Sequence, residues 1–352
     1  MNPRIRTIHT KLKKENIDGL IISKQANISY LTGYISRDSC LLVSKNKTIY
    51  FTDSRYIEEA KHSLKDCAIM QSNGPMMEAV TAACNKLGLK RIGFEEKYTS
   101  FAEYGKIKKS LDKTAELIPT QGLTEGQRQL KCQPELENMA RAVEITIGAL
   151  NFIEDFISPG KREIEIAAEL ERFIRYNGAT SSSFGIIVAS GPNSSYPHHM
   201  TSRRIIKSNE PVLIDIGVSF NGYKSDLTRV YFLGKINSLY RKIYAIVREA
   251  QGRAIKKIKP DTSISRIDAA ARQFIAQKGY AKFFGHALGH GIGLEVHEEP
   301  RISGKENNKL KAGMVVTIEP AIYLPGRFGV RIEDMVLVTR KGHEVLSGSL
   351  NK

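Results

Sequence analysis

The sequence predicts an α+β protein of two domains, in which a smaller α/β domain precedes a larger one built from separate runs of strands and helices. Two observations lead to this prediction. At 352 residues the chain is longer than one typical domain. Apolar runs alternate with helical patterns in the first third of the chain, whereas strands and helices are grouped in the remainder.

The first domain is expected to occupy residues 1–125. Its strands are predicted from short, partly β-branched apolar runs, and its helices from apolar residues at helical spacing. The predicted strands are residues 19–23, 39–44, 48–52, 88–95 and 116–120, and the predicted helices are residues 3–16, 54–64 and 76–88. This alternation is typical of an α/β domain.

The second domain is expected to occupy residues 126–352 and to open with a long helix at 134–157, which starts with proline and has two glutamates in its first turn. The other predicted strands are residues 184–190, 211–220, 222–233, 314–324 and 329–339, and the other predicted helices are residues 163–177, 238–258 and 263–279. Grouped strands and helices favour an antiparallel curved sheet covered by helices.

Composition excludes several classes of protein. Hydrophobic residues make up 41% of the chain and charged residues 26%, which is ordinary for a soluble globular protein. No apolar run approaches the roughly 20 residues that a membrane-spanning helix needs, and the N-terminal residues lack the apolar centre of a secretory signal. The four cysteines form no CxxC pair, which disfavours a disulfide framework or a thiolate metal site. We expect a cytoplasmic protein without membrane contact.

The formal charge of +16 raises the alternative of nucleic-acid binding. The lysines and arginines are, however, spread along the chain without arginine-rich tracts or interleaved aromatic residues. This distribution favours solvated helix faces. We expect no nucleic-acid partner.

Two aspartates flank a predicted hairpin in the second domain. Asn221-Gly222 lies between two strand-like runs and is a strong signal for a two-residue turn. In that register Asp226 faces Gly217, and Asp215 lies two residues along on the same face, roughly 5 to 8 Å away. Like charges this close in a partly desolvated site are costly unless one is protonated or a cation lies between them. The alternative is a pair of solvated residues beside the turn.

Three further residues add to this pair. Glu319 and Glu333 stand in apolar strand-like runs, and His290 lies in the stretch FFGHALGHGIGLEVHEEP at 283–300. Each glutamate alone could be a charge at a strand edge. Together with the aspartates, the three supply five ligands, as needed by a two-metal site of the manganese, cobalt or zinc type.

The same stretch contains two more histidines, His286 and His297, one on each side of His290. The glycines around His290 would allow the backbone to approach a ligand closely. The flanking histidines would then contact substrate or carry protons rather than bind metal.

These motifs, taken in order, resemble the pita-bread metallopeptidases, the group of methionine aminopeptidase, aminopeptidase P and prolidase. The resemblance covers residues 134–340 and is carried by IDIG, SDLTR, GHGIG followed by VHEEP, TIEP and RIED. SYLTGY and YFTDSRY resemble the domain that precedes the catalytic one in aminopeptidase P and prolidase. The implied fold is a pita-bread catalytic domain after a creatinase/prolidase-type α/β domain.

The resemblance implies a role for each matching residue. The implied metal ligands are Asp215, Asp226, His290, Glu319 and Glu333. They would hold two divalent ions per chain, with manganese favoured and cobalt or zinc as alternatives. The implied catalytic residues are His198, His286, His297, Glu319 and Arg331, and Tyr323 would lie near the substrate. Ala321 stands where this branch commonly has glycine.

The HxxGH spacing favours the branch that acts on proline peptides. We expect an Xaa-Pro aminopeptidase, which removes the N-terminal residue from peptides with proline second; the alternative is an Xaa-Pro dipeptidase. The complete ligand set disfavours a non-catalytic binding module and a metal-independent hydrolase of the creatinase type. Relatives with this layout are usually dimers, so we expect a homodimer. In the first domain, Arg37 is the candidate to grip a substrate carboxylate.

Overall fold

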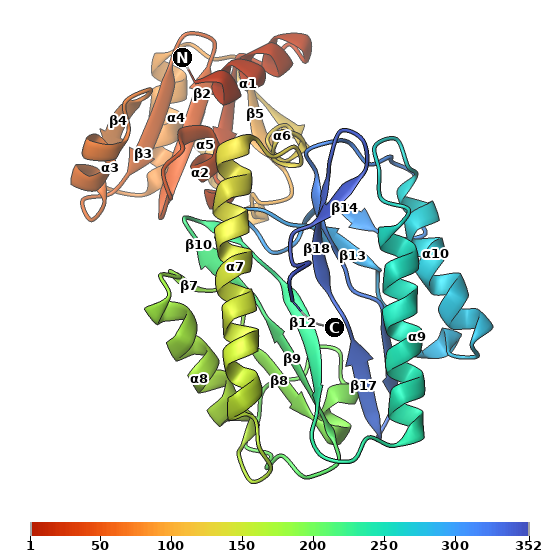
Figure 1. Cartoon of the computed structure of the whole chain (residues 1–352). Helices are drawn as coiled ribbons and strands as arrows, with labels where there is room; N and C mark the ends of the chain where they lie inside the picture. The colour runs from red at the N-terminus through yellow and green to blue at the C-terminus, as the bar shows by residue number, and fades with distance from the viewer. Residues whose placement is uncertain (1, 351–352) are drawn as a thin grey trace. The chain divides into compact units, whose positions relative to one another are not determined.

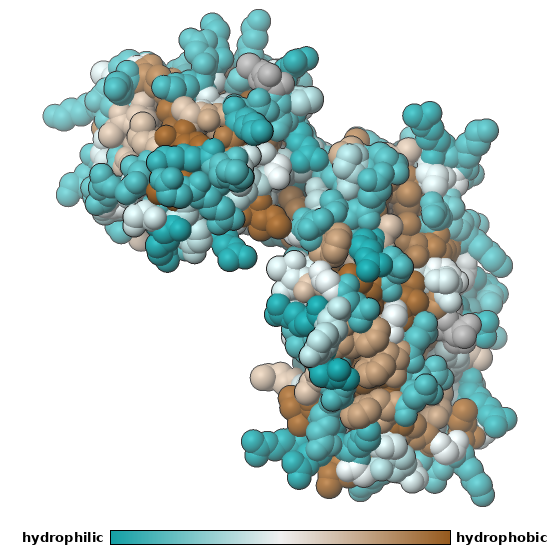
Figure 2. Space-filling model, turned by 60° about the vertical axis from the view of Figure 1, so that its left-hand side comes forward, coloured by the Kyte–Doolittle hydropathy of each residue, from teal (hydrophilic) through white to brown (hydrophobic). Residues whose placement is uncertain are grey.

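The structure is a computed structural model that describes residues 2–350. Its contacts divide the chain into two compact units, with the division between Arg128 and Gln129 (Figure 1). Within the described residues, no helix is long and apolar enough to cross a membrane. Hydrophilic side chains cover much of the face in Figure 2, with apolar residues scattered among them.

The first unit is built on one mixed sheet of six strands in the order β4-β3-β2-β1-β5-β6. The strands are β1 Gly19–Ile22, β2 Ser39–Ser44, β3 Thr48–Thr52, β4 Ala68–Gln71, β5 Arg91–Glu95 and β6 Glu116–Thr120. The helices are α1 Pro3–Lys14, α2 Gln25–Thr32, α3 Ile57–Ser63, α4 Met76–Lys86, α5 Phe101–Ser110 and α6 Glu125–Arg128. Every residue of β1 and β2 is buried, which explains their continuous apolar sequences.

Helices α2, α5 and α6 and strand β4 were not predicted from the sequence. The start of helix α5 could have been predicted from the sequence, because Ser100 and Glu103 form a capping box there. Helix α2 is only eight residues long and ends at Gly33, whose φ of 72° is left-handed. Three of the four residues of β4 are exposed, so its sequence lacks a strand's apolar face.

The second unit packs four long helices against several short antiparallel sheets. The helices are α7 Gln133–Phe156, α8 Glu163–Tyr176, α9 Ser238–Ile255 and α10 Ile264–Gln277. The sheets have the orders β11-β10-β7, β12-β9-β8, β14-β13-β15-β18-β19 and β16-β17. Their strands are β7 Ser181–Ser182, β8 Ile187–Ser190, β9 Pro211–Ile216, β10 Val218–Phe220, β11 Tyr223–Lys224, β12 Leu227–Phe232, β13 Gly289–Gly291, β14 Glu298–Ile302, β15 Val315–Ile318, β16 Ala321–Leu324, β17 Phe328–Arg331, β18 Asp334–Val338 and β19 His343–Val345.

Two hydrophobic clusters form the core of this unit. In one, α7 and α8 pack against strands that include β8, β9 and β12, and in the other α9 and α10 pack against strands that include β15, β17 and β18 (Figure 1). The predicted α+β architecture, with helices covering antiparallel strands, is confirmed.

The hairpin predicted at Asn221-Gly222 is also confirmed. Both turn residues have positive φ, 47° and 83°, and Phe220 pairs with Tyr223. The same register continues where Thr228 pairs with Asp215. Each predicted strand is nevertheless divided in two, one at Gly217 and the other at residues 225–226. The two backbones approach closely there, since a Cβ at Gly217 would lie 2.0 Å from the carbonyl oxygen of Ser225.

The glycines around His290 were expected to let the backbone approach a ligand, but the structure gives two of them a different role. His290 lies in β13, which the sequence analysis missed and which pairs with β14 and β15. A Cβ at Gly289 would lie 1.9 Å from the carbonyl oxygen of Thr317, and one at Gly291 would lie 2.3 Å from that of Glu299. These glycines therefore make room for neighbouring strands rather than for a ligand.

We predict that Gly289→Ala lowers the free energy of unfolding by about 1–3 kcal/mol, because the methyl group meets backbone that cannot rotate away. Gly285→Ala is the matched control, since a Cβ there meets nothing within 4 Å. Urea unfolding measures both variants. Equal stability of the two would contradict the close packing at Gly289.

Candidate metal centre

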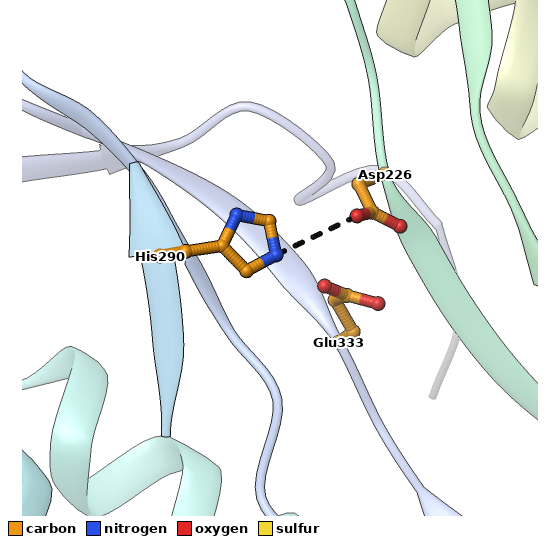
Figure 3. Close-up of side chains that lie close together, drawn as sticks. All are labelled: Asp226, His290 and Glu333. Carbon is orange, nitrogen blue, oxygen red and sulfur yellow. Dashed lines mark ion pairs between the residues drawn. The ribbon is translucent and has the colours of Figure 1, made fainter. Parts of the chain in front are cut away.

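Five segments of the second unit bring the predicted ligand residues together. Asp215 lies in β9 and His290 in β13, while Asp226, Glu319 and Glu333 lie just outside strand ends. Figure 3 shows the side chains of Asp226, His290 and Glu333 pointing toward one another, and one ligand atom of each lies within 4.8 Å of the others. The Nε2 atom of His290 is 3.7 Å from Asp226 Oδ2 and 3.6 Å from Glu319 Oε1.

Asp215 is connected to this group through Arg331 and Thr228. The Nη2 atom of Arg331 donates to Asp215 Oδ2 at 2.5 Å, and its Nε donates to Thr228 Oγ1 at 3.1 Å. Thr228 in turn donates to Glu333 Oε2 at 2.8 Å. One guanidinium thus fixes two of the carboxylates, one directly and one through a hydroxyl group.

Two carboxylate oxygens of the cluster have no partner among the described residues. Asp215 Oδ1 and Asp226 Oδ1 are both buried and accept no hydrogen bond. Buried polar atoms are nearly always satisfied, so an orphaned acceptor in a native site needs an explanation. A cation between the two aspartates would provide one.

The raised pKa values of the carboxylates also favour a cation in this cluster. Burial, and then the charge of Asp215, raises the pKa of Glu333 to about 8. Burial, and then the charge of Glu333, also raises the pKa values of Asp226 and Glu319 well above their usual range. The carboxylates therefore resist ionising together, and positive charge is needed before all of them can do so.

His290 is held in the form that binds metals. Burial lowers its pKa to about 4, so the ring is neutral at pH 7. Its Nδ1 donates to the carbonyl oxygen of Gly291 at 3.0 Å, which leaves the Nε2 lone pair facing the carboxylates. Hard carboxylate oxygens with one imidazole suit divalent ions such as manganese, cobalt or zinc, so the residues fit a metal centre.

His286, His297 and Tyr323 also lie in this site. The rings of His297 and His290 meet edge to face with centroids 4.4 Å apart. The Nδ1 of His286 donates to the carbonyl oxygen of Ala287, so its Nε2 can accept from Tyr323 Oη at 3.3 Å. Arg331 donates to the same phenol oxygen at 2.6 Å. Burial lowers the pKa of His286 to about 4, which makes its ring a neutral wall of the site.

His198 stands on an exposed segment at the edge of the site. The preceding carbonyl, of Pro197, accepts from Arg331 Nη1 at 3.1 Å. After burial, His198 is the next cause that lowers the pKa of His297, so the two histidines are neighbours. The structure therefore assembles all of the predicted second-domain residues in one place.

Arg37 is the exception, because it belongs to the first unit. Its side chain is exposed and lines an open pocket of about 480 Å³ together with Tyr34, Ile35 and Glu59. Its predicted contact with a substrate carboxylate stays a prediction.

Comparison with known proteins agrees with this geometry. Residues 137–340 match the model of metallopeptidase family M24, and residues 4–130 match that of the creatinase/prolidase N-terminal domain. The chain belongs to metallopeptidase family M24. Both the predicted family and the predicted fold are thereby confirmed, and the protein is a peptidase.

Similar proteins match this peptidase over nearly their whole length. An Xaa-Pro dipeptidase of Pyrococcus horikoshii is 35% identical over 99% of this chain and 97% of its own. The structure of an Xaa-Pro dipeptidase from Bacillus anthracis has a TM-score of 0.95 at 38% identity, covering 99% of this chain and 98% of its own. That of an X-Pro aminopeptidase from Thermotoga maritima has a TM-score of 0.88 at 35% identity, covering 96% and 97%.

Two residues that hold the strands carrying the predicted ligands were not predicted from the sequence. Arg229 donates to the carbonyl oxygen of Glu333 at 2.7 Å and forms a buried ion pair with Asp334. Gln251, fully buried on α9, donates to the carbonyl oxygens of Ile318 and Ile332, next to the two glutamates. A lone glutamine on the apolar face of a predicted helix was the available signal.

We predict that the chelator-treated peptidase loses stability as the pH rises from about 6.5 to about 8. Folded Glu333, with a pKa near 8, keeps a proton that the unfolded chain, with a value near 4.5, has released, so the native state binds more protons there. Below pH 6.5, the depressed pKa values of His286 and His290 act in the opposite direction. Denaturant unfolding across this window measures the slope.

Glu333→Gln is the test variant, because it cannot ionise. It should reduce the fall in stability above pH 6.5, the ordinary histidine value. A flat or rising profile in the chelator-treated parent would contradict the raised pKa of Glu333.

Proposed function

We propose that this peptidase is an Xaa-Pro dipeptidase, which hydrolyses dipeptides with proline in the second position. The observation that carries the proposal is the buried cluster of carboxylates and His290, with its two orphaned oxygens, in a chain that aligns end to end with Xaa-Pro dipeptidases. The aminopeptidase expected from the sequence is supported less well. It remains the second candidate, because the similar Thermotoga maritima protein is an X-Pro aminopeptidase.

The proposed cofactor is a pair of divalent ions, with manganese favoured over cobalt or zinc. The proposed ligands are Asp215, Asp226, His290, Glu319 and Glu333. Their chemistry and the unpaired oxygens of the two aspartates support this assignment. When bound, such ions lower the pKa of a water molecule and polarise the scissile carbonyl group.

The chain's own residues would bind the substrate and move protons. Glu319 is partly exposed, with Oε1 3.6 Å from His290 Nε2, and would pass a proton to the leaving prolyl nitrogen. His297 and His198, on the exposed side of the site, would stabilise the negative charge that develops on the carbonyl oxygen.

The remaining residues would shape the pocket. His286 and Tyr323 would present neutral ring surface to the proline, which suits an apolar ring better than charged groups would. Arg331 would orient Asp215 and the phenol of Tyr323. A homodimer and a cytoplasmic location complete the proposal.

We predict that removing metal with a chelator abolishes dipeptide hydrolysis and that manganese restores it, with metal analysis approaching two ions per chain, as expected for two-metal catalysis. Asp226→Asn should lose metal and activity while circular dichroism shows an intact fold. Asp155→Asn, an exposed change on α7, is the control. Full activity of metal-free protein would refute the proposed centre.

We predict that kcat/KM for Ala-Pro exceeds that for Ala-Pro-Ala by about tenfold or more, the value of one charged hydrogen bond to a substrate carboxylate. If Arg37 supplies that bond, Arg37→Ala should lower the dipeptide rate to the tripeptide level. The exposed Arg6 gives a matched control, Arg6→Ala. Faster cleavage of the tripeptide would favour the aminopeptidase, and rapid cleavage of Ala-Ala would remove the preference for proline.

A further inference from the structure

Residues 190–202, the segment that carries His198, have little regular structure of their own. Between β8 and β9, only the short 3-10 helix η1, Gly191–Ser195, is regular. Tyr196 is 60% exposed and Met200 86% exposed, so apolar burial does not fix the tip. A side chain that must meet a reacting atom needs firmer support than such a segment gives by itself.

Glu163 provides this support from the first turn of α8. Its side chain is fully buried, and its carboxylate accepts hydrogen bonds from four residues of the segment. The donors to Oε1 are Ser190 N at 2.7 Å, Ser190 Oγ at 2.7 Å and Asn193 Nδ2 at 3.0 Å. The donors to Oε2 are His199 Nε2 at 2.9 Å, Ser202 Oγ at 2.5 Å, Ser202 N at 3.2 Å and Asn193 Nδ2 at 3.2 Å.

The donors come from both sides of His198 along the chain. Ser190 and Asn193 precede it, His199 follows it directly, and Ser202 closes the segment. All of these partners are N–H or O–H donors, and an ionised carboxylate accepts hydrogen bonds without donating any, so a charged carboxylate fits among them. Burial alone would raise the pKa of Glu163, but the hydrogen bonds from Ser202, Ser190 and His199 outweigh it and leave the pKa below its usual value.

Strand β17 holds the other side of the segment. Gly329 N donates to Ser194 Oγ at 2.9 Å, and a Cβ at Gly329 would lie only 2.1 Å from the carbonyl oxygen of Ser194. Arg331, at the end of β17, donates to the carbonyl oxygen of Pro197. The peptide of His198 is therefore fixed between β17 and the carboxylate of Glu163.

We propose that Glu163 is a positioning residue of the peptidase reaction, whose buried carboxylate folds residues 190–202 so that His198 faces the scissile bond. The inference rests on the proposed function, because the role of His198 belongs to it. Because its side chain is fully buried, Glu163 itself would not touch the substrate. It acts through His198, so its effect on the rate depends on that side chain.

The test variant is Glu163→Gln, which keeps the volume of the side chain but turns an amide NH₂ toward groups that are themselves donors. We expect kcat to fall by about 10- to 100-fold, the scale for displacing a catalytic group by about 1 Å, while KM and metal content stay near the parent values. Glu165→Gln is the matched control, because Glu165 lies two residues further along α8 and is exposed. Its one capping hydrogen bond, from Arg162 N, is one that glutamine can also accept.

A double-mutant cycle separates positioning from general destabilisation. If Glu163 acts through His198, adding Glu163→Gln to His198→Ala should lower kcat no further. Hydrogen exchange gives a readout that does not involve activity: the amides of residues 190–204 should exchange faster in Glu163→Gln than in Glu165→Gln. Should Glu163→Gln fail to fold, Asn193→Ala removes one donor instead and enters the same cycle.

Three results would overturn the inference. They are a parent-like kcat in Glu163→Gln, additive losses in the double variant, and unchanged exchange of residues 190–204. A loss of activity in His198→Ala without one in Glu163→Gln refutes the inference alone. Full activity in His198→Ala refutes the proposed role of His198 as well.

Discussion

Repulsion among buried carboxylates is the constraint on which this site depends. Asp215, Asp226 and Glu333 are buried close to one another with Glu319 at the rim. Burial and the charges of neighbouring carboxylates raise the pKa values of Asp226, Glu319 and Glu333. Arg331 supplies a positive charge from within the cluster. The proposed divalent cation would supply the rest, which would turn a group that costs stability when empty into a binding site.

Hydrogen bonds to the backbone and close packing hold the strands that carry this cluster in place. Arg229 and Gln251 bind the backbone beside Glu319 and Glu333. The missing side chains of Gly289 and Gly291 let β13 pack against its neighbours at backbone distance, and that contact fixes His290. The geometry of the proposed metal centre therefore rests on backbone hydrogen bonds and close packing more than on attraction among the proposed ligands.

Two histidines of the centre make the same kind of hydrogen bond, whereas His199 makes a different one. His286 and His290 each use Nδ1 to bind a nearby carbonyl oxygen, so that Nε2 faces the site as a neutral acceptor. His199 instead donates to the buried carboxylate of Glu163 and, in the proposed arrangement, helps to orient its neighbour His198. Adjacent histidines in SSYPHH thus have opposite tasks, which the sequence SSYPHH alone does not distinguish.

The sequence by itself determined the family, the two-domain α+β architecture and the register of the hairpin at Asn221-Gly222. These follow from local rules, namely strand and helix periodicity, turn chemistry and ordered motifs. The same rules missed β13 and β14, because glycines and charged residues replace a strand's alternating pattern where backbones pack closely.

Only the tertiary structure decided which polar residues support the site. Glu163, Arg229 and Gln251 act on residues up to 105 positions away in the chain, a separation that no local pattern spans. The positions of these three residues in the sequence do not reveal their partners, since burial and hydrogen-bond geometry exist only once distant strands and helices meet. Likewise, the glycines beside His290 were expected to make space for a ligand, but in the structure they make space for a neighbouring strand. Only the folded chain shows what occupies that space.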